Sequence, residues 1–142
     1  RGLGDVYKRQ EQVDATLLSD LIHKGVVPVM APLTHDGHGN MLNTNADTIA
    51  GETAKALSAL FDVTLVYCFE KKGVLRDEND DDSVIPQITR TEFEQYVADG
   101  VIQGGMIPKL ENSFEAINAG VSEVVITLAS AINDSGGTRI KK

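Results

Sequence analysis

Two asparagines and an aspartate stand at alternate positions where a polar loop is predicted to become a helix. They are Asn43, Asn45 and Asp47. Because they are two residues apart, their amide and carboxylate groups can turn toward the crevice beyond the strand ends, where open α/β sheets bind ligands. A simpler interpretation is that Asn45 caps the helix and that Asp47 only favours the positive end of its dipole. The spacing alone leaves both interpretations open.

A second candidate is the segment 104–109, which reads Gly-Gly-Met-Ile-Pro-Lys. Two glycines let the backbone approach a ligand closely, and Pro108 suits the first turn of a helix. The amides at a helix start attract anions, and Lys109 adds a full positive charge. Phosphoryl transfer needs such a charge, because positioned cations stabilise the negative charge of the transferring group. The alternative is that Lys109 is a solvated surface lysine, since the segment is not a Walker A loop.

The segment 69–75 directly follows a predicted buried strand and reads Phe-Glu-Lys-Lys-Gly-Val-Leu. A strand that ends in a polar turn with a glycine is a natural wall for a nucleotide. It is equally an ordinary connection between a strand and the next element, which is the more common case. Glu70 is the acidic residue that we retain as a candidate nucleotide contact.

Other polar residues favour purely structural interpretations, so no metal site is predicted. His35 and His38 lie in a turn without a supporting framework of carboxylates or thiols. The acidic run 77–82 lacks the alternating ligands and central glycine of an EF-hand, and it is predicted to be a solvated loop. Cys68 lies inside an apolar strand and is predicted to be a small buried side chain, not a nucleophile.

The composition limits the classes of function. The chain has 142 residues, 42% of them hydrophobic and 5% aromatic, and a formal net charge of −8. An acidic chain without a basic stripe is a poor binder of nucleic acid or anionic membranes, so an anionic ligand needs a local site. The single cysteine excludes an intrachain disulfide and indicates a reducing, cytoplasmic location. No apolar run approaches the roughly 20 residues that span a bilayer. Residues 1–10 show no initiator methionine and no amphipathic period, and we expect them to be non-native.

Helical and strand patterns alternate along the rest of the chain, which predicts an α/β fold with a mainly parallel sheet. Asp36-Gly37 predicts a hairpin turn, and Thr91 with Glu94 predicts a capping box at a helix start. Residues 26–33 are expected to form a buried strand, 63–69 a central strand and 136–140 a short edge strand. Further elements are predicted as helices over residues 14–25, 45–61 and 91–100 and from the double glycine to Gly120, with a buried strand over 121–128.

In their order and separation, these segments resemble the N-acetylglutamate kinases of the amino acid kinase superfamily. The matching stretches are VVPVMAPLTHDGHGNMLNTNADTIAGETAKAL (26–57), KKGVLRD (71–77) and DGVIQGGMIPKLENSFEAINAGVSEVVI (99–126). The succession of N-T-N-A-D-T-I-A-G-E and G-G-M-I-P-K is much more specific than either motif alone. The resemblance implies a three-layer α/β/α sandwich of the amino acid kinase type, with residues 11–142 as its C-terminal, ATP-binding domain.

The resemblance also implies a role for each matched residue. Asn43 would contact the acylated amino acid, Asp47 would organise the active-site lysines, and Lys109 would stabilise the transferring phosphoryl group. The nucleotide would lie against two segments, which comprise Glu70, Lys71, Lys72, Gly73, Val74 and Leu75, and Val101, Ile102 and Gln103. The implied reaction moves the γ-phosphoryl group of ATP, bound with Mg²⁺, to the side-chain carboxylate of N-acetyl-L-glutamate, a step of arginine biosynthesis. The assignment requires the Asp47 carboxylate and the Lys109 ammonium to converge on one cleft.

The sequence departs from the family pattern in two ways. The family usually has D-V-x-G in the nucleotide turn, where this chain has Glu70-Lys71-Lys72-Gly73. The family's N-terminal lobe, which supplies a second lysine, a glycine pair and an arginine, has no counterpart here. We therefore expect the 142-residue chain to be inactive alone and the full-length enzyme to be a homo-oligomer. Two alternatives remain, namely a kinase of another acylated amino acid or carbamate, and a non-catalytic module that binds nucleotide or amino acid.

Overall fold

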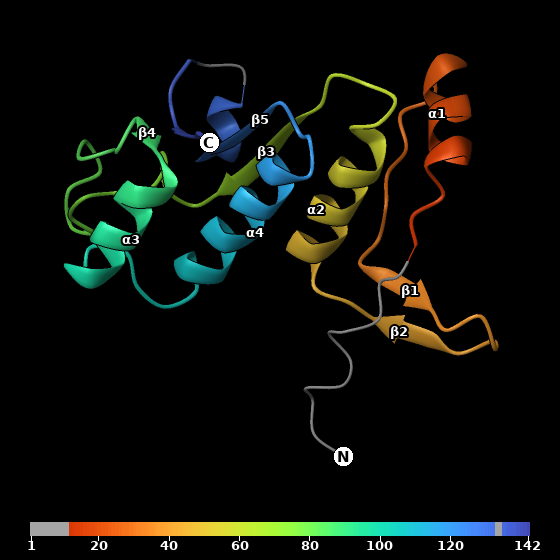
Figure 1. Cartoon of the computed structure of the whole chain (residues 1–142), viewed down its shortest axis with the longest axis horizontal. Coiled ribbons are helices and arrows are strands. Elements are labelled where there is room, and N and C mark those ends of the chain that lie inside the picture. The colour runs from red at the N-terminus through yellow and green to blue at the C-terminus, as the bar shows by residue number, and fades with distance from the viewer. Residues whose placement is uncertain (1–11, 133–134) are drawn as a thin grey trace.

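The computed structural model describes residues 12–132 and 135–142, and Figure 1 shows their arrangement. The described part starts with a helix and a hairpin and continues into helices that pack on a sheet. The helices are α1 (Ala15–His23), α2 (Ala46–Leu57), α3 (Arg90–Ala98), α4 (Met106–Asn118) and the 3₁₀ helix η2 (Ala129–Ala131). The strands are β1 (Leu33–His35), β2 (Met41–Asn43), β3 (Thr64–Phe69), β4 (Gln87–Ile88), β5 (Glu123–Leu128) and β6 (Thr138–Ile140). The predicted alternation of helices and strands along the chain and the predicted α/β class are both confirmed.

The main sheet has the strand order β3-β5-β6-β4 in the described chain. β3 pairs with β5 in parallel and β4 with β6 in parallel, whereas β5 and β6 are antiparallel, so the sheet is mixed with a parallel majority. Two predictions about strand position were wrong. β3 lies at one edge of the described sheet instead of its centre, and β6 lies between β5 and β4 instead of at an edge. Sequence patterns report burial and not strand order, and Thr138 and Ile140 are buried because β6 has a neighbour on each side.

The helix ends follow local capping chemistry. The Asn45 side chain accepts a hydrogen bond from the Thr48 amide and starts α2, as predicted. The capping box of α3 is formed by Thr89 and Glu92, not by the predicted pair two residues later. Both pairs have the same Thr-x-x-Glu spacing, and the earlier pair is used because α3 already begins at Arg90.

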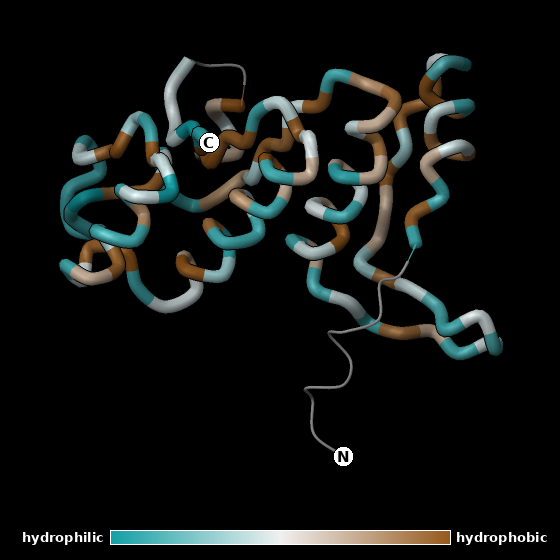
Figure 2. Tube along the Cα trace, in the orientation of Figure 1, coloured by the Kyte–Doolittle hydropathy of each residue, from teal (hydrophilic) through white to brown (hydrophobic). Residues whose placement is uncertain are grey.

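The buried core lies between the main sheet and helices α2, α3 and α4. α2 packs against α4 and β3, and α4 in turn contacts β5 and β6. The largest fully buried side chains of the core include Ile88, Ile102, Leu110, Ile126 and Ile140. Figure 2 shows apolar residues in the sheet and also along the segment that precedes the hairpin, so hydropathy alone does not identify the core.

Residues 26–33 do not form the predicted buried strand. Of these residues only Leu33 belongs to a strand, at the start of β1, and Val27 and Val29 are 83% and 94% exposed. Pro28 and Pro32 have no amide to donate, and the described residues place no strand beside the segment. A strand needs a neighbour to bond its amides and carbonyls. The hairpin predicted from Asp36-Gly37 is confirmed, because β1 and β2 pair in antiparallel register around it.

Cys68 is exposed, so the prediction of a buried thiol was wrong. Side chains alternate between the two faces of a strand, and in β3 the buried positions are Leu65 and Tyr67. Cys68 therefore points to the opposite face. The apolar composition of β3 suited a strand buried on both faces, whereas in the described chain only one face is well covered.

Candidate functional site

The Asp47 carboxylate and the Lys109 ammonium form an ion pair, with 2.6 Å between Oδ2 and Nζ. Asp47 lies in the first turn of α2 and Lys109 in the first turn of α4, so two helix starts meet at this point. The Lys109 side chain is only 9% exposed, whereas the Asp47 side chain is 36% exposed. The carboxylate therefore faces solvent and the ammonium lies beneath it. The two residues converge, as the sequence-based assignment required.

Two aromatic rings of β3 lie beside the ammonium group. The Lys109 Nζ atom is 4.5 Å from the centre of the Phe69 ring and 4.9 Å from that of the Tyr67 ring. The Tyr67 hydroxyl donates a hydrogen bond of 3.3 Å to the backbone carbonyl of Asp47. Burial, together with the charges of Asp47 and Glu52, raises the pKa of Tyr67 to about 12. Tyr67 is therefore neutral at physiological pH and contacts both members of the ion pair.

Neither Tyr67 nor Phe69 was predicted to lie beside Lys109. The available signal was their spacing, because residues two apart in a strand point to the same face. That spacing could not indicate which helices cover the face. The structure supplies this information by placing the starts of α2 and α4 over it.

The double glycine before α4 leaves room for a ligand. A side chain added at Gly104 or Gly105 would meet no atom within 4 Å. The amides of Met106 and Ile107 are already bonded to the carbonyls of Gln103 and Gly104, and the next residue is a proline. Attraction of an anion to this helix start must therefore come from the helix dipole and the Lys109 charge more than from free amides of the first turn.

The predicted nucleotide turn is held against β6 by one threonine. The Thr138 hydroxyl accepts a bond of 2.8 Å from the Val74 amide and donates one of 2.6 Å to the Ile85 carbonyl. A side chain at Gly73 would come within 2.8 Å of the same hydroxyl, so only glycine fits. Val74 and Leu75 point into the core. Any contact of these three residues with a nucleotide would therefore be made by their backbone.

The charged residues of this turn are exposed and face the acidic loop 77–82. Lys71 pairs with Asp81 at 2.9 Å, and Lys72 pairs with Asp82 at 2.7 Å. The hydrogen bond and charge of Asp82 raise the pKa of Lys72, and those of Lys72 in turn lower the pKa of Asp82. Glu70 is exposed at the end of β3. Solvent screens such pairs strongly, so they leave the turn free to exchange partners.

The remaining predicted contacts lie in two other places. Ile102 is buried and Val101 packs against the core, whereas Gln103 is exposed and donates a hydrogen bond to the Gly100 carbonyl. This segment leads directly into the double glycine. Asn43 is exposed at the end of β2, four residues before Asp47.

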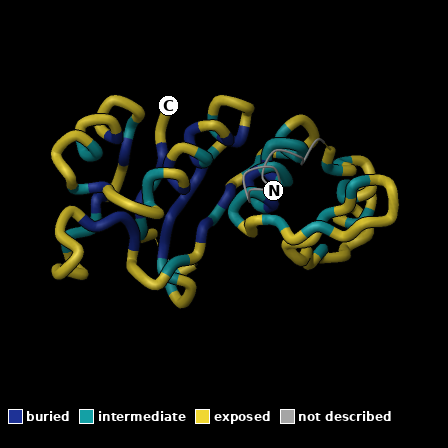
Figure 3. Tube along the Cα trace, turned by 90° about the horizontal axis from the view of Figure 1, so that it is seen from below, coloured by how far each residue is buried: buried dark blue, intermediate teal, exposed yellow. Residues whose placement is uncertain are grey.

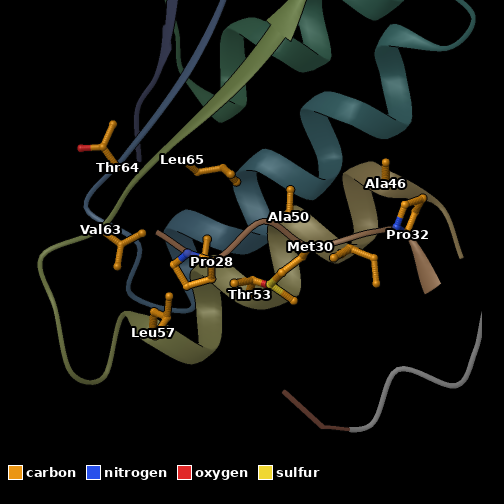
Figure 4. Close-up of a pocket in the computed structure, with 12 residues that line it drawn as sticks. Pro28, Met30, Pro32, Ala46, Ala50, Thr53, Leu57, Val63, Thr64 and Leu65 are labelled. Carbon is orange, nitrogen blue, oxygen red and sulfur yellow. The ribbon is translucent and has the colours of Figure 1, made fainter. Parts of the chain in front are cut away.

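An apolar cavity of about 350 Å³ lies between the segment 28–32 and α2, and Figure 4 shows its lining. Its walls are Pro28, Met30, Pro32, Ala46, Ile49, Ala50, Thr53, Ala54, Leu57, Val63, Thr64 and Leu65. Neither Asp47 nor Lys109 lines it, so this cavity is separate from the ion pair. Within the described ranges, no group of three or more His, Cys, Asp or Glu side chains could hold a metal ion. No helix among the same residues is long and apolar enough to cross a membrane.

The fold and the ion pair define an α/β protein in which a paired carboxylate and ammonium lie where two helices begin. The model of the amino acid kinase family matches residues 5–128, and the chain belongs to this family. The match begins inside the segment 1–10. Our prediction that this segment is non-native concerns residues outside the described ones and stays a prediction.

Close relatives are acetylglutamate kinases, which confirms the resemblance found in the sequence. The enzyme of Bacteroides thetaiotaomicron is 89% identical over 140 residues, which are 99% of this chain and 53% of the relative. That of Cytophaga hutchinsonii is 54% identical over 97% of this chain and 53% of the relative. The chain spans about half the length of the curated relatives that it matches.

Solved structures share the fold. Protein smu.665 of Streptococcus mutans has a TM-score of 0.73 and 30% identity, over 92% of this chain and 49% of that protein. Carbamate kinase of Giardia has a TM-score of 0.68 and 20% identity, over 91% of this chain and 47% of that enzyme. The second likeness concerns the fold alone.

Proposed function

We propose that this chain supplies the ATP-binding side of a carboxylate kinase that phosphorylates N-acetyl-L-glutamate, a step of arginine biosynthesis. The names of the close relatives and the matched motifs support this acceptor. The chain would form part of an enzyme about twice its length, which we expect to be a homo-oligomer in the cytoplasm. ATP would enter as its Mg²⁺ complex, and the metal ion would neutralise phosphate charge as part of the substrate.

The observation that carries the proposal is the ion pair of Asp47 with Lys109. Phosphoryl transfer develops negative charge on the transferring group, and a cation fixed near it lowers the barrier. Asp47 holds the Lys109 ammonium in place before a ligand arrives, so little reorganisation is needed during the reaction. Simple nucleotide binding would not require a lysine that is largely buried and paired.

The other predicted contacts have the chemistry that the reaction needs. The exposed amide of Asn43 can bond the acceptor, and it lies just before α2, the helix that carries Asp47. The residues from Glu70 to Leu75 and from Val101 to Gln103 would hold the nucleotide, partly through their backbone. These residue roles are part of the proposal.

A chimeric enzyme tests the proposal. The 142-residue chain is joined to the part of the B. thetaiotaomicron relative outside the aligned residues, and acyl phosphate is trapped with hydroxylamine. Lys109→Ala should lower kcat by about 10²–10³-fold, because it removes a charge that acts on the transition state. The matched control is Lys55→Ala, which removes a lysine paired with Glu52 elsewhere on the surface. A rise in KM with unchanged kcat would contradict the proposed role of Lys109.

The choice of acceptor is tested in the same assay. N-acetyl-L-glutamate should be phosphorylated faster than N-formyl-L-glutamate, free glutamate or carbamate. The 142-residue chain without the added part should give no acyl phosphate. Turnover by the chain alone, or a preference for carbamate, would overturn the corresponding part of the proposal.

A further inference from the structure

The ammonium of Lys109, on α4, is contacted by groups from two other elements. Asp47 of α2 contacts it from the exposed side, and the rings of Tyr67 and Phe69 lie beside it on β3. The backbone carbonyl of Lys109 accepts a bond from Ser113, which fixes the helix turn but not the ammonium. The ammonium therefore has one carboxylate and two ring faces as its neighbours.

Burying a lysine is unfavourable unless its charge is compensated. A long lysine side chain ordinarily extends its ammonium into water. Here the carboxylate is the more exposed partner, so Asp47 alone would allow the ammonium to move outward with it. The face of an aromatic ring attracts a cation, because the ring quadrupole is negative there. The rings of Tyr67 and Phe69 therefore draw the ammonium toward β3 and away from solvent. The two rings thus oppose the outward movement.

We propose that Phe69 and Tyr67 are positioning residues that hold the Lys109 ammonium in its inward, Asp47-paired orientation by cation–π contact. Phe69 acts through its ring alone. Tyr67 acts through its ring and also bonds the Asp47 backbone, so it fixes the spacing between the two helix starts. The effect of this positioning on catalysis rests on the proposed function, whereas the positioning of Lys109 itself does not.

The packing around Tyr67 supports a specific placement of its ring. A side chain added at Gly51 would lie 3.4 Å from the Tyr67 hydroxyl. Gly51 is one helical turn after Asp47 on α2 and is buried. The Tyr67 hydroxyl therefore packs closely against this turn of α2 while its ring lies beside Lys109.

Acylation of Lys109 measures the positioning without any turnover. The folded 142-residue chain is pulsed with acetic anhydride, and modification of Lys109 is followed by mass spectrometry of its peptide. Phe69→Leu should raise the rate of Lys109 acylation about five-fold, because one cation–π contact is lost. Phe61→Leu is the matched control. It removes another half-buried ring, which packs on His23.

Conservative variants separate a ring effect from general loosening. Phe69→Tyr keeps a ring in place, so it should leave the acylation rate within about two-fold of the original. Tyr67→Phe keeps the ring but loses the bond to Asp47, so its acylation rate should lie between those of the original and Tyr67→Leu. Tyr67→Leu should raise the rate. Circular dichroism checks the fold of each variant, and Phe69→Met replaces Phe69→Leu if the latter unfolds. Equal acylation rates in the original, Phe69→Leu or its replacement, and Phe61→Leu chains would overturn the proposal.

The chimeric enzyme then distinguishes this inference from the proposed function. Phe69→Leu should lower kcat about five-fold with little change in the KM for ATP, as expected when one contact that orients a charge is lost. If Lys109→Ala leaves turnover intact, the proposed function fails, and the acylation rates still decide whether the rings position Lys109. If Lys109→Ala abolishes turnover while the Phe69→Leu and Tyr67→Leu chains show unchanged acylation, the positioning role fails alone.

Discussion

The two ends of the described chain differ sharply in burial. None of residues 12–48 is buried, whereas every core side chain comes from Ile49 or later. In Figure 3 the buried residues gather around the main sheet, which we call the packed part, whereas α1 and the hairpin are exposed or intermediate. We call residues 12–48 the open part. The ion pair joins the two, since Asp47 belongs to the last residues of the open part and Lys109 to the packed part.

The comparison shows what apolar sequence can and cannot predict. Residues 26–33 and strand β5 are both rich in valine, yet the first is exposed and the second is buried. β5 has a strand on each side and helix α4 against it. The first segment has no strand beside it within the described chain, and an apolar cavity lies between it and α2. Apolar composition therefore reports a tendency to be covered, and backbone pairing decides whether a strand forms.

The largest expected difference in stability between the two parts comes from substituting two glycines with similar φ angles. Gly137 has φ of 91° and Gly39 has φ of 90°, and a side chain at Gly137 would lie 2.6 Å from the Ile126 carbonyl oxygen. Gly137→Ala should lower the free energy of unfolding by about 3 kcal/mol, through strain and overlap together. Gly39→Ala, with open space around it, should lower it by about 1 kcal/mol. Urea denaturation checks both, and equal losses would refute the comparison.

Truncating one valine in each part should give the next largest difference in the free energy of unfolding. Val124 is 0% exposed in β5 and Val29 is 94% exposed. Val124→Ala should lower the free energy of unfolding by about 2 kcal/mol, because it leaves a cavity in the core. Val29→Ala should change it by less than about 0.5 kcal/mol. A large loss in the Val29 variant, measured by urea denaturation, would mean that the open segment is packed in solution.

The packed part should also determine the stability at alkaline pH. The folded pKa of Tyr67 is raised to about 12 from an ordinary 10, so the folded chain binds more protons than the unfolded chain between these values. The free energy of unfolding should therefore fall as the pH rises from 10 to 12. Tyr67→Phe should flatten this fall in thermal unfolding experiments. An unchanged slope would show that another group is responsible.

The smallest effect belongs to the open part, at acid pH. The Asn40 side chain and the His38 amide bond the Asp36 carboxylate and lower its pKa below 3.8. Because the pKa of Asp36 is lower in the folded chain, the ionised carboxylate stabilises the hairpin above pH 3.8. This stabilisation is lost as the pH falls through the pKa of Asp36 in the folded chain. NMR shifts of the β1–β2 hairpin should change in this window while the signals of β5 stay constant. Simultaneous changes in both would show that the hairpin is not an independent unit.

Much of the fold could be predicted because its signals are local. Asn45 starts α2 and Gly120 follows α4, and both were predicted from the chemistry of single residues. The order of the strands was not predictable, because residue types such as Thr138 and Ile140 suit an edge strand and an inner strand equally well. Strand β4 was missed, because two residues, Gln87 and Ile88, are too few to show a pattern.

The candidate site was predictable only where single residues reveal their chemistry. Asp47 and Lys109 could be proposed from motif and charge, and the structure brings them together. The rings beneath Lys109 could not, because an aromatic residue in a strand is ordinarily part of the core. Their role follows from the meeting of three elements that are far apart in the sequence.

The Thr138 hydroxyl has a consequence for the order in which the protein assembles during translation. It secures the Val74 amide, although the two residues are 64 positions apart. A ribosome must therefore synthesise dozens of residues beyond the turn before this anchor becomes available. Until then, the turn that we assign to the nucleotide lacks the hydrogen bond that fixes its position.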